Sequence, residues 1–143
     1  MVFCLTVLIK SNWSEIMSEK IGDFALHHVN NTYDRSGDKT LRTHVNWELK
    51  EQHEVWGTGF GTLIVEHDMN NPNAKSGECS WQGETFQPDG NRTMSWQEGT
   101  WETTDEHTWL VNMKGWDSLH GDLRSEGVIS LADLTFSGSV YKA

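Results

Sequence analysis

Apolar and polar side chains alternate along the chain from residue 40 onward. Between residues 41 and 49 the odd-numbered positions, which include Val45 and Trp47, are mostly apolar, whereas even-numbered positions such as Arg42 and Glu48 are polar. Successive side chains of a β-strand point to opposite faces, so this period of two predicts a strand with one buried face. Half-buried strands of this kind are typical of antiparallel sheets.

The same alternation predicts further short strands separated by tight turns. They cover residues 57–67, 77–86, 92–102, 106–115, 119–131 and 134–142. The separators contain the turn formers Asn, Asp, Gly and Pro, as in the sequence PDGN at residues 88–91. Residues 21–33 are either an opening strand or a short helical lid, because periodicity over so few positions fits both.

The expected fold is therefore all-β, a single antiparallel meander of about seven or eight strands. Strands with this regular spacing close into a β-barrel or fold into a β-sandwich. Glycines lie inside the expected strands and not only between them, for example Gly59, Gly99 and Gly138. Interior glycine permits bends and close approach of neighbouring strands, which curl a sheet. We therefore expect a closed or nearly closed barrel and keep the sandwich as the alternative.

Length and composition indicate one folded domain. The 143 residues are enough for one core, and the apolar share of 36% and charged share of 22% are typical of a folded protein. Residues 1–9 read MVFCLTVLI, a run far shorter than the roughly 20 residues of a membrane span. We expect residues 1–16 to be an apolar N-terminal extension and residues 17–143 to be a single barrel domain.

The net charge and the number of cysteines limit which partners and which cellular compartment we expect. Twenty-one acidic residues against eleven basic ones give a formal charge of -10, which repels phosphate backbones and anionic lipids. We therefore expect neither a nucleic-acid nor a membrane partner. The two cysteines, Cys4 and Cys79, are too few for a disulfide framework and lack the spacing of a metal motif. A cytoplasmic protein is the expectation.

The sequence contains no recognised motif for catalysis or cofactor binding. The segment GTGFGTL at residues 57–63 has closely spaced glycines, but no helical pattern follows it, as a dinucleotide-binding fingerprint requires. The patterns of a nucleophile elbow, a phosphate-binding loop and a zinc site are absent from the sequence. We expect no cofactor and no metal.

One set of apolar side chains is expected to line the barrel interior. Its large aromatic and sulfur-containing members are the expected ligand-binding residues: Trp47, Met94, Trp96, Trp109 and Met113. Such side chains line ligand pockets, but they are also the ordinary material of a packed core. Both interpretations of the stripe stay open at this point.

Three ionisable residues share faces with that apolar set and are the candidate catalytic residues. Glu98 alternates in phase with Trp96, His107 with Trp109, and Glu66 with Ile64. An acid or imidazole on an apolar wall acquires a perturbed pKa and suits proton transfer. All three lie near the ends of expected strands, where simple solvation is the competing explanation.

The later strands carry a resemblance to a known group of barrels. The segments WQEGTWETTDEHTWLVNMKG and LRSEGVISLADLTFSGSVY repeat glycine and aromatic residues along each strand. In this they resemble small bacterial β-barrels of the allene oxide cyclase and lipocalin (calycin) type, over residues 40–142. The resemblance implies a cup-shaped interior that binds a small hydrophobic molecule, and enzymes that work without cofactor or metal. No catalytic residue of that group matches this chain position by position.

Three functions from different classes follow from these observations. The first is a binding protein whose barrel encloses a small apolar or aromatic molecule. The second is a cofactor-free isomerase, cyclase or hydrolase, which requires Glu98 and His107 to face inward. The third is a carbohydrate-binding module that uses exposed Trp56, Trp101 or Trp116. We also expect a homo-oligomer, most simply a dimer, because strand edges and the apolar extension invite pairing.

Overall fold

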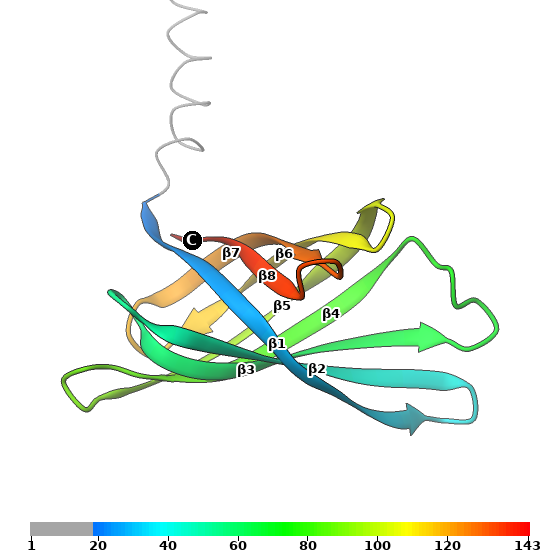
Figure 1. Cartoon of the computed structure of the whole chain (residues 1–143), viewed down its shortest axis with the longest axis horizontal. Coiled ribbons are helices and arrows are strands. Elements are labelled where there is room, and N and C mark those ends of the chain that lie inside the picture. The colour runs from blue at the N-terminus through cyan, green and yellow to red at the C-terminus, as the bar shows by residue number, and fades with distance from the viewer. Residues whose placement is uncertain (1–18) are drawn as a thin grey trace, which may run out of the picture.

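Eight antiparallel strands form a closed barrel in the computed structural model, which describes residues 19–143 (Figure 1). The strands are β1 (Lys20–Ser36), β2 (Thr40–His53), β3 (Gly57–Asp68), β4 (Ser76–Phe86), β5 (Arg92–Asp105), β6 (Thr108–Asp117), β7 (Gly121–Ser130) and β8 (Thr135–Lys142). The expected all-β meander is confirmed, as a barrel and not a sandwich. Residues 21–33 belong to β1, so the helical alternative for them is wrong. The expected extension, residues 1–16, lies outside the described residues.

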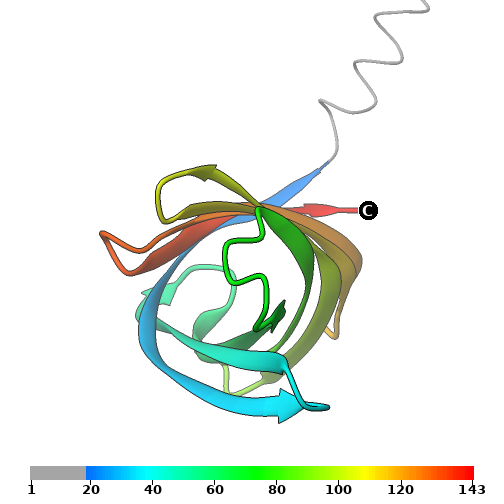
Figure 2. The same ribbon diagram turned by 90° about the vertical axis from the view of Figure 1, so that its right-hand side faces the viewer.

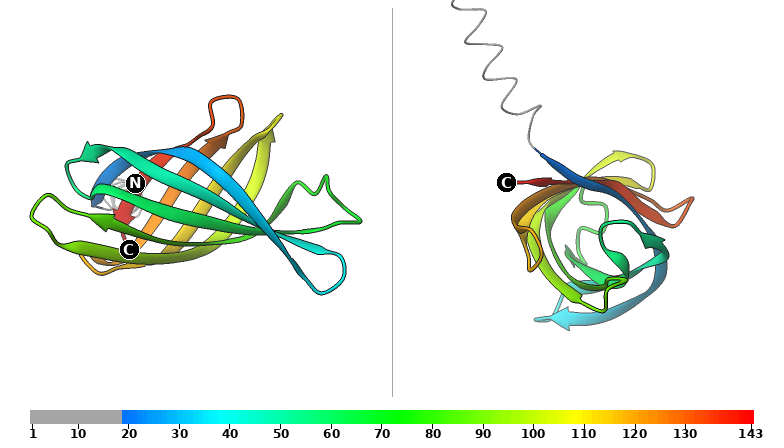
Figure 3. Two further views of the ribbon diagram at one scale, coloured as in Figure 1. Left: turned by 60° about the horizontal axis from the view of Figure 1, so that its bottom comes forward. Right: turned by 90° about the vertical axis from the view of Figure 1, so that its left-hand side faces the viewer.

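The barrel closes because the first and last of these strands pair with each other. Their antiparallel register runs from Lys20 opposite Tyr141 to His27 opposite Thr135. The views along the barrel show the strands surrounding one interior (Figure 2), and they cross the barrel obliquely (Figure 3). Every described strand is therefore paired on both sides. The pairing is staggered, because β1 pairs with β8 from Lys20 to His27 and with β2 from His27 to Ser36. Each edge of β1 is thus free over part of its length, and the expected dimer stays a prediction.

Interior glycines allow neighbouring strands of the barrel to approach closely. A Cβ added at Gly99 of β5 would overlap the carbonyl oxygen of Asn112 on β6, and one at Gly115 would overlap that of Trp96. Only glycine fits where the backbone of the next strand is this near. The structure therefore supports the expectation that glycine inside the strands serves the curvature of the sheet.

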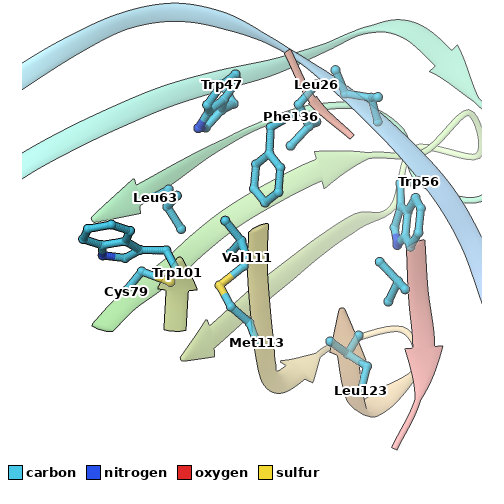
Figure 4. Close-up of a cluster of buried hydrophobic side chains, with 12 residues drawn as sticks. Leu26, Trp47, Trp56, Leu63, Cys79, Trp101, Val111, Met113, Leu123 and Phe136 are labelled. Atoms are coloured by element: carbon cyan, nitrogen blue, oxygen red, sulfur yellow. The ribbon is translucent and has the colours of Figure 1, made fainter. Parts of the chain in front are cut away.

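Apolar side chains fill the half of the barrel that lies toward the β1–β2 and β3–β4 turns. The close-up in Figure 4 shows Leu63, Cys79 and Trp101 together at one side of the cluster, with Trp56 and Leu123 at the other. The alternation of apolar residues also placed Val111, Leu123, Ile129, Phe136 and Val140 in the interior together with Trp47, Trp109 and Met113, and all of them face inward. Trp109 and Ile129 are half-buried, and the others are buried.

Strand β5 faces the opposite way from our expectation. Met94 and Trp96 lie on the outer wall with 51% and 50% of their surface exposed, whereas Gln97 and Trp101 are buried inside. Trp96 and Trp101 are five positions apart, so alternation sends one of them in and the other out. Gln97 and Gly99 alternate in phase with Trp101, and this side of β5 faces the interior.

Candidate functional site

A cavity of about 100 Å³ lies inside the barrel, in the half where β1 begins and β8 ends. All eight strands contribute to its wall. Large apolar side chains form one side, including Phe24 of β1, Leu49 of β2 and Phe136 of β8. The other side carries small ones from β3 to β7: Gly59, Thr85, Thr93, Ser95 and Ser125. The space remains because these small side chains do not reach the large ones opposite.

The small side chains form a polar stripe across an otherwise apolar wall. The Ser125 hydroxyl donates a hydrogen bond to Oε1 of Gln97 at 2.6 Å, which turns the amide nitrogen of Gln97 away from Ser125. The indole nitrogen of Trp81 donates to the Ser95 hydroxyl at 3.3 Å. The Thr85 hydroxyl is buried and has no partner among the described residues.

A stripe of this kind can orient a guest molecule. Buried hydroxyl and amide groups normally find hydrogen-bond partners, and an unpaired one is destabilising by roughly 1–3 kcal/mol. The Thr85 hydroxyl is an unpaired group of this kind, and its residue borders the cavity.

Trp56 and His53 close the end of the cavity at the β2–β3 turn. The backbone N–H of Val55 donates to Nδ1 of His53 at 3.0 Å, so the ring proton of the neutral imidazole lies on Nε2. That nitrogen donates to the carbonyl oxygen of Asp23 at 2.6 Å, which ties the turn to β1. The Trp56 ring packs against His53 with centroids 4.8 Å apart. The fixed imidazole thereby holds the indole across the end of the barrel.

Asp117 borders the same cavity at the end of β6. Its side chain is buried, and its Oδ1 accepts hydrogen bonds from the backbone N–H groups of Leu119 and His120 in the β6–β7 turn. Oδ2 lies 3.0 Å from Nδ1 of His120. The carboxylate thus caps the turn on one side and meets the cavity on the other.

The expected ligand-binding residues are only partly brought together at the cavity. Met113 borders it. Trp47 and Trp109 face the interior but pack in the filled half of the barrel. Met94 and Trp96 point to solvent, so their expected place in the interior is wrong.

The candidate catalytic residues do not reach the interior. Glu98 and Glu66 lie on the outer wall in a shallow groove, and Glu66 pairs with Arg42 at 3.1 Å. His107 occupies the exposed β5–β6 turn with a positive φ of 51°. The expectation that Glu98 and His107 face inward is therefore wrong. Neither residue is placed to transfer a proton inside the barrel.

The expected carbohydrate platform is also dispersed. Trp56 and Trp101 are buried inside the barrel, and Trp116 is exposed on the outer wall. The exposed indoles of strands β5 and β6 are Trp96 and Trp116, whose Cα atoms are cross-strand partners. A platform of three exposed rings at the expected positions is therefore not formed.

Sequence reasoning missed the polar members of the cavity wall. Ser95 and Gln97 alternate in phase with Gly99 and Trp101, on the side of β5 that had been assigned to solvent, whereas Asp117 follows the expected strand 106–115. The signal that would have found them is the spacing of Trp101 from Trp96. Assigning Trp101 to the interior brings the polar residues of β5 inside with it.

A metal site and a membrane-spanning helix are both absent from the described part of the chain. Among residues 19–143 no three His, Cys, Asp or Glu side chains gather so that they could hold a metal ion. The same residues include no helix that could cross a lipid bilayer. No protein-family model, curated protein or solved structure matches the chain.

Proposed function

We propose that the protein binds one small, mainly apolar molecule inside the barrel. The observation that carries this proposal is the cavity itself, with apolar walls and a buried Thr85 hydroxyl that has no partner among the described residues. Ligand sites are typically apolar hollows in which a few polar groups fix the orientation of the guest. The stripe of Thr85, Ser95 and Gln97 supplies such groups.

The size of the cavity limits the guest. An apolar cavity of roughly 150 Å³ holds benzene in another protein, and about 100 Å³ is available here. A guest smaller than benzene, such as a short branched chain, therefore fits best. It gains the burial of its apolar surface at roughly 25 cal/mol per Å², and one polar substituent hydrogen-bonds to the polar stripe.

Tryptophan fluorescence tests the proposal, because Trp56 and Trp81 border the cavity. We expect saturable changes with short branched compounds. The variant Ser125→Leu places a larger side chain in the cavity and should abolish the change. Ser137→Leu makes the same substitution on the exposed face of β8 and should leave binding intact.

Two results would contradict this function. One is the absence of a saturable change across a panel of such compounds. The other is unaltered binding by Ser125→Leu, since a guest that tolerates this variant is bound somewhere other than the cavity. Far-UV circular dichroism of both variants checks that each retains the barrel.

A further inference from the structure

One carboxylate places a negative charge in the wall of the cavity. Among the described residues that border it, Asp117 is the one charged side chain. It is 2% exposed, and no lysine or arginine lies along the same wall. A charge in apolar surroundings acts strongly on a guest, because little solvent screens it.

The β6–β7 turn does not need this charge. Oδ1 of Asp117 accepts from the backbone N–H groups of Leu119 and His120, and the amide oxygen of an asparagine accepts equally well in such a turn. His120 is the ionisable side chain that contacts Asp117, with its Nδ1 3.0 Å from Oδ2, and it offsets the negative charge only when its imidazole is protonated. With a neutral imidazole the charge of Asp117 has no basic partner among the described residues.

Neighbouring groups complete a site for a positive charge. Ser95 is the cross-strand partner of Asp117, so the two side chains are adjacent on the inner face. The Ser95 hydroxyl already accepts from Trp81 and has a second lone pair. Aromatic rings of Trp56 and Phe24 also border the cavity, and their faces attract cations. A carboxylate, a hydroxyl and aromatic faces are together what an ammonium group requires.

We infer that the guest of the cavity is a compact organic cation, an ammonium group on a short branched apolar body, bound with its charge at Asp117. This inference rests on the proposed binding function. An anionic guest meets the Asp117 carboxylate at close range and is excluded. A neutral guest of the same shape fits but lacks the charged hydrogen bond.

Three short branched compounds of similar size test this charge preference: isobutylamine, isobutanol and isobutyrate. Hydrogen bonds to charged groups exceed neutral ones by about 1.4 kcal/mol, which is a factor of about ten in affinity. The wild-type protein should therefore bind isobutylamine about tenfold more tightly than isobutanol, and isobutyrate not measurably. Asp117→Asn keeps the turn and should bind the amine and the alcohol alike. Asp122→Asn removes an exposed carboxylate on β7 and should behave as wild type.

The outcomes separate this inference from the function on which it rests. Equal binding of amine and alcohol by the wild type, or an amine preference that survives in Asp117→Asn, overturns the cation site. The barrel remains a binding protein in that case if Ser125→Leu abolishes binding of the alcohol. Failure of all three compounds together with the wider panel overturns the binding function itself. The wild-type comparison decides the charge preference even when Asp117→Asn does not fold.

Discussion

Replacing Phe136 by alanine measures how far the barrel depends on its central aromatic cluster. Phe136 of β8 is 2% exposed, and its ring meets those of Phe24, Trp47 and Trp81 with centroids 5.2, 5.6 and 6.2 Å apart. Truncating a buried phenylalanine destabilises a protein by about 3–5 kcal/mol. Phe136 already borders the cavity on one side, so it has fewer neighbours to lose there. We therefore expect a loss near the lower limit, about 3 kcal/mol.

Urea unfolding followed by far-UV circular dichroism gives this quantity. With an m-value of roughly 1.5 kcal/mol/M, a loss of about 3 kcal/mol lowers the urea midpoint by about 2 M. The slope should stay unchanged, because the same surface becomes exposed on unfolding. A changed slope would indicate a different unfolded or native state and not a simple loss of packing.

Phe60→Ala is the matched control, since it makes the same substitution on the outer wall of β3. Phe60 is 58% exposed, and we expect a loss below about 1 kcal/mol. Comparable losses for the two variants would refute the assignment of Phe136 to the interior and Phe60 to the exterior. A small loss for Phe136→Ala alone would show that the ring does not hold the cluster together.

Two further predictions concern β5 and Cys79. Gly99→Ala places a methyl group against the backbone of β6 and should destabilise the barrel by about 1–3 kcal/mol, which lowers the thermal midpoint by roughly 4–12 °C; an unchanged midpoint would contradict the close approach of these strands. Burial raises the pKa of the Cys79 thiol from 9.0 to about 11. In a Cys4→Ser variant, Cys79 is the one thiol left, and Ellman's reagent at pH 8 should react with it slowly in the native protein and rapidly in urea. Because the unfolded thiol loses its proton first, stability should also fall as the pH rises from about 9 to about 11; fast reaction of the native thiol or a flat stability profile would count against this.

The fold was predictable from the sequence because, in most strands, the large apolar residues all fall on one of the two alternating faces. In β2, Val45 and Trp47 alternate with charged and polar neighbours, and only one face of such a strand can be buried. Strand β5 lacks this property, since Met94 and Trp96 occupy one phase and Trp101 occupies the other. Its orientation therefore becomes clear only in the assembled barrel, where Trp101 is buried and Trp96 is exposed.

The cavity was not predictable by the same reasoning. Thr85, Ser95 and Ser125 are small and polar, and a pattern-based assignment gives such residues to solvent. Ser95 faces inward because it alternates in phase with the buried Trp101, and Ser125 does so because it alternates in phase with the buried Leu123. Asp117 is followed by a turn in the sequence, so its capping role was foreseeable, whereas its contact with an interior space was not.

Closure of the barrel through β1 and β8 has a consequence for synthesis on the ribosome. About a hundred residues separate the end of β1 from the start of β8. At roughly 5–20 residues per second, β1 waits about 5–20 s before its second partner has been made. During that interval the nascent chain presents one unpaired edge of β1 to its surroundings. Chaperone contact or mispairing with a neighbouring nascent chain in this period decides the yield of folded protein.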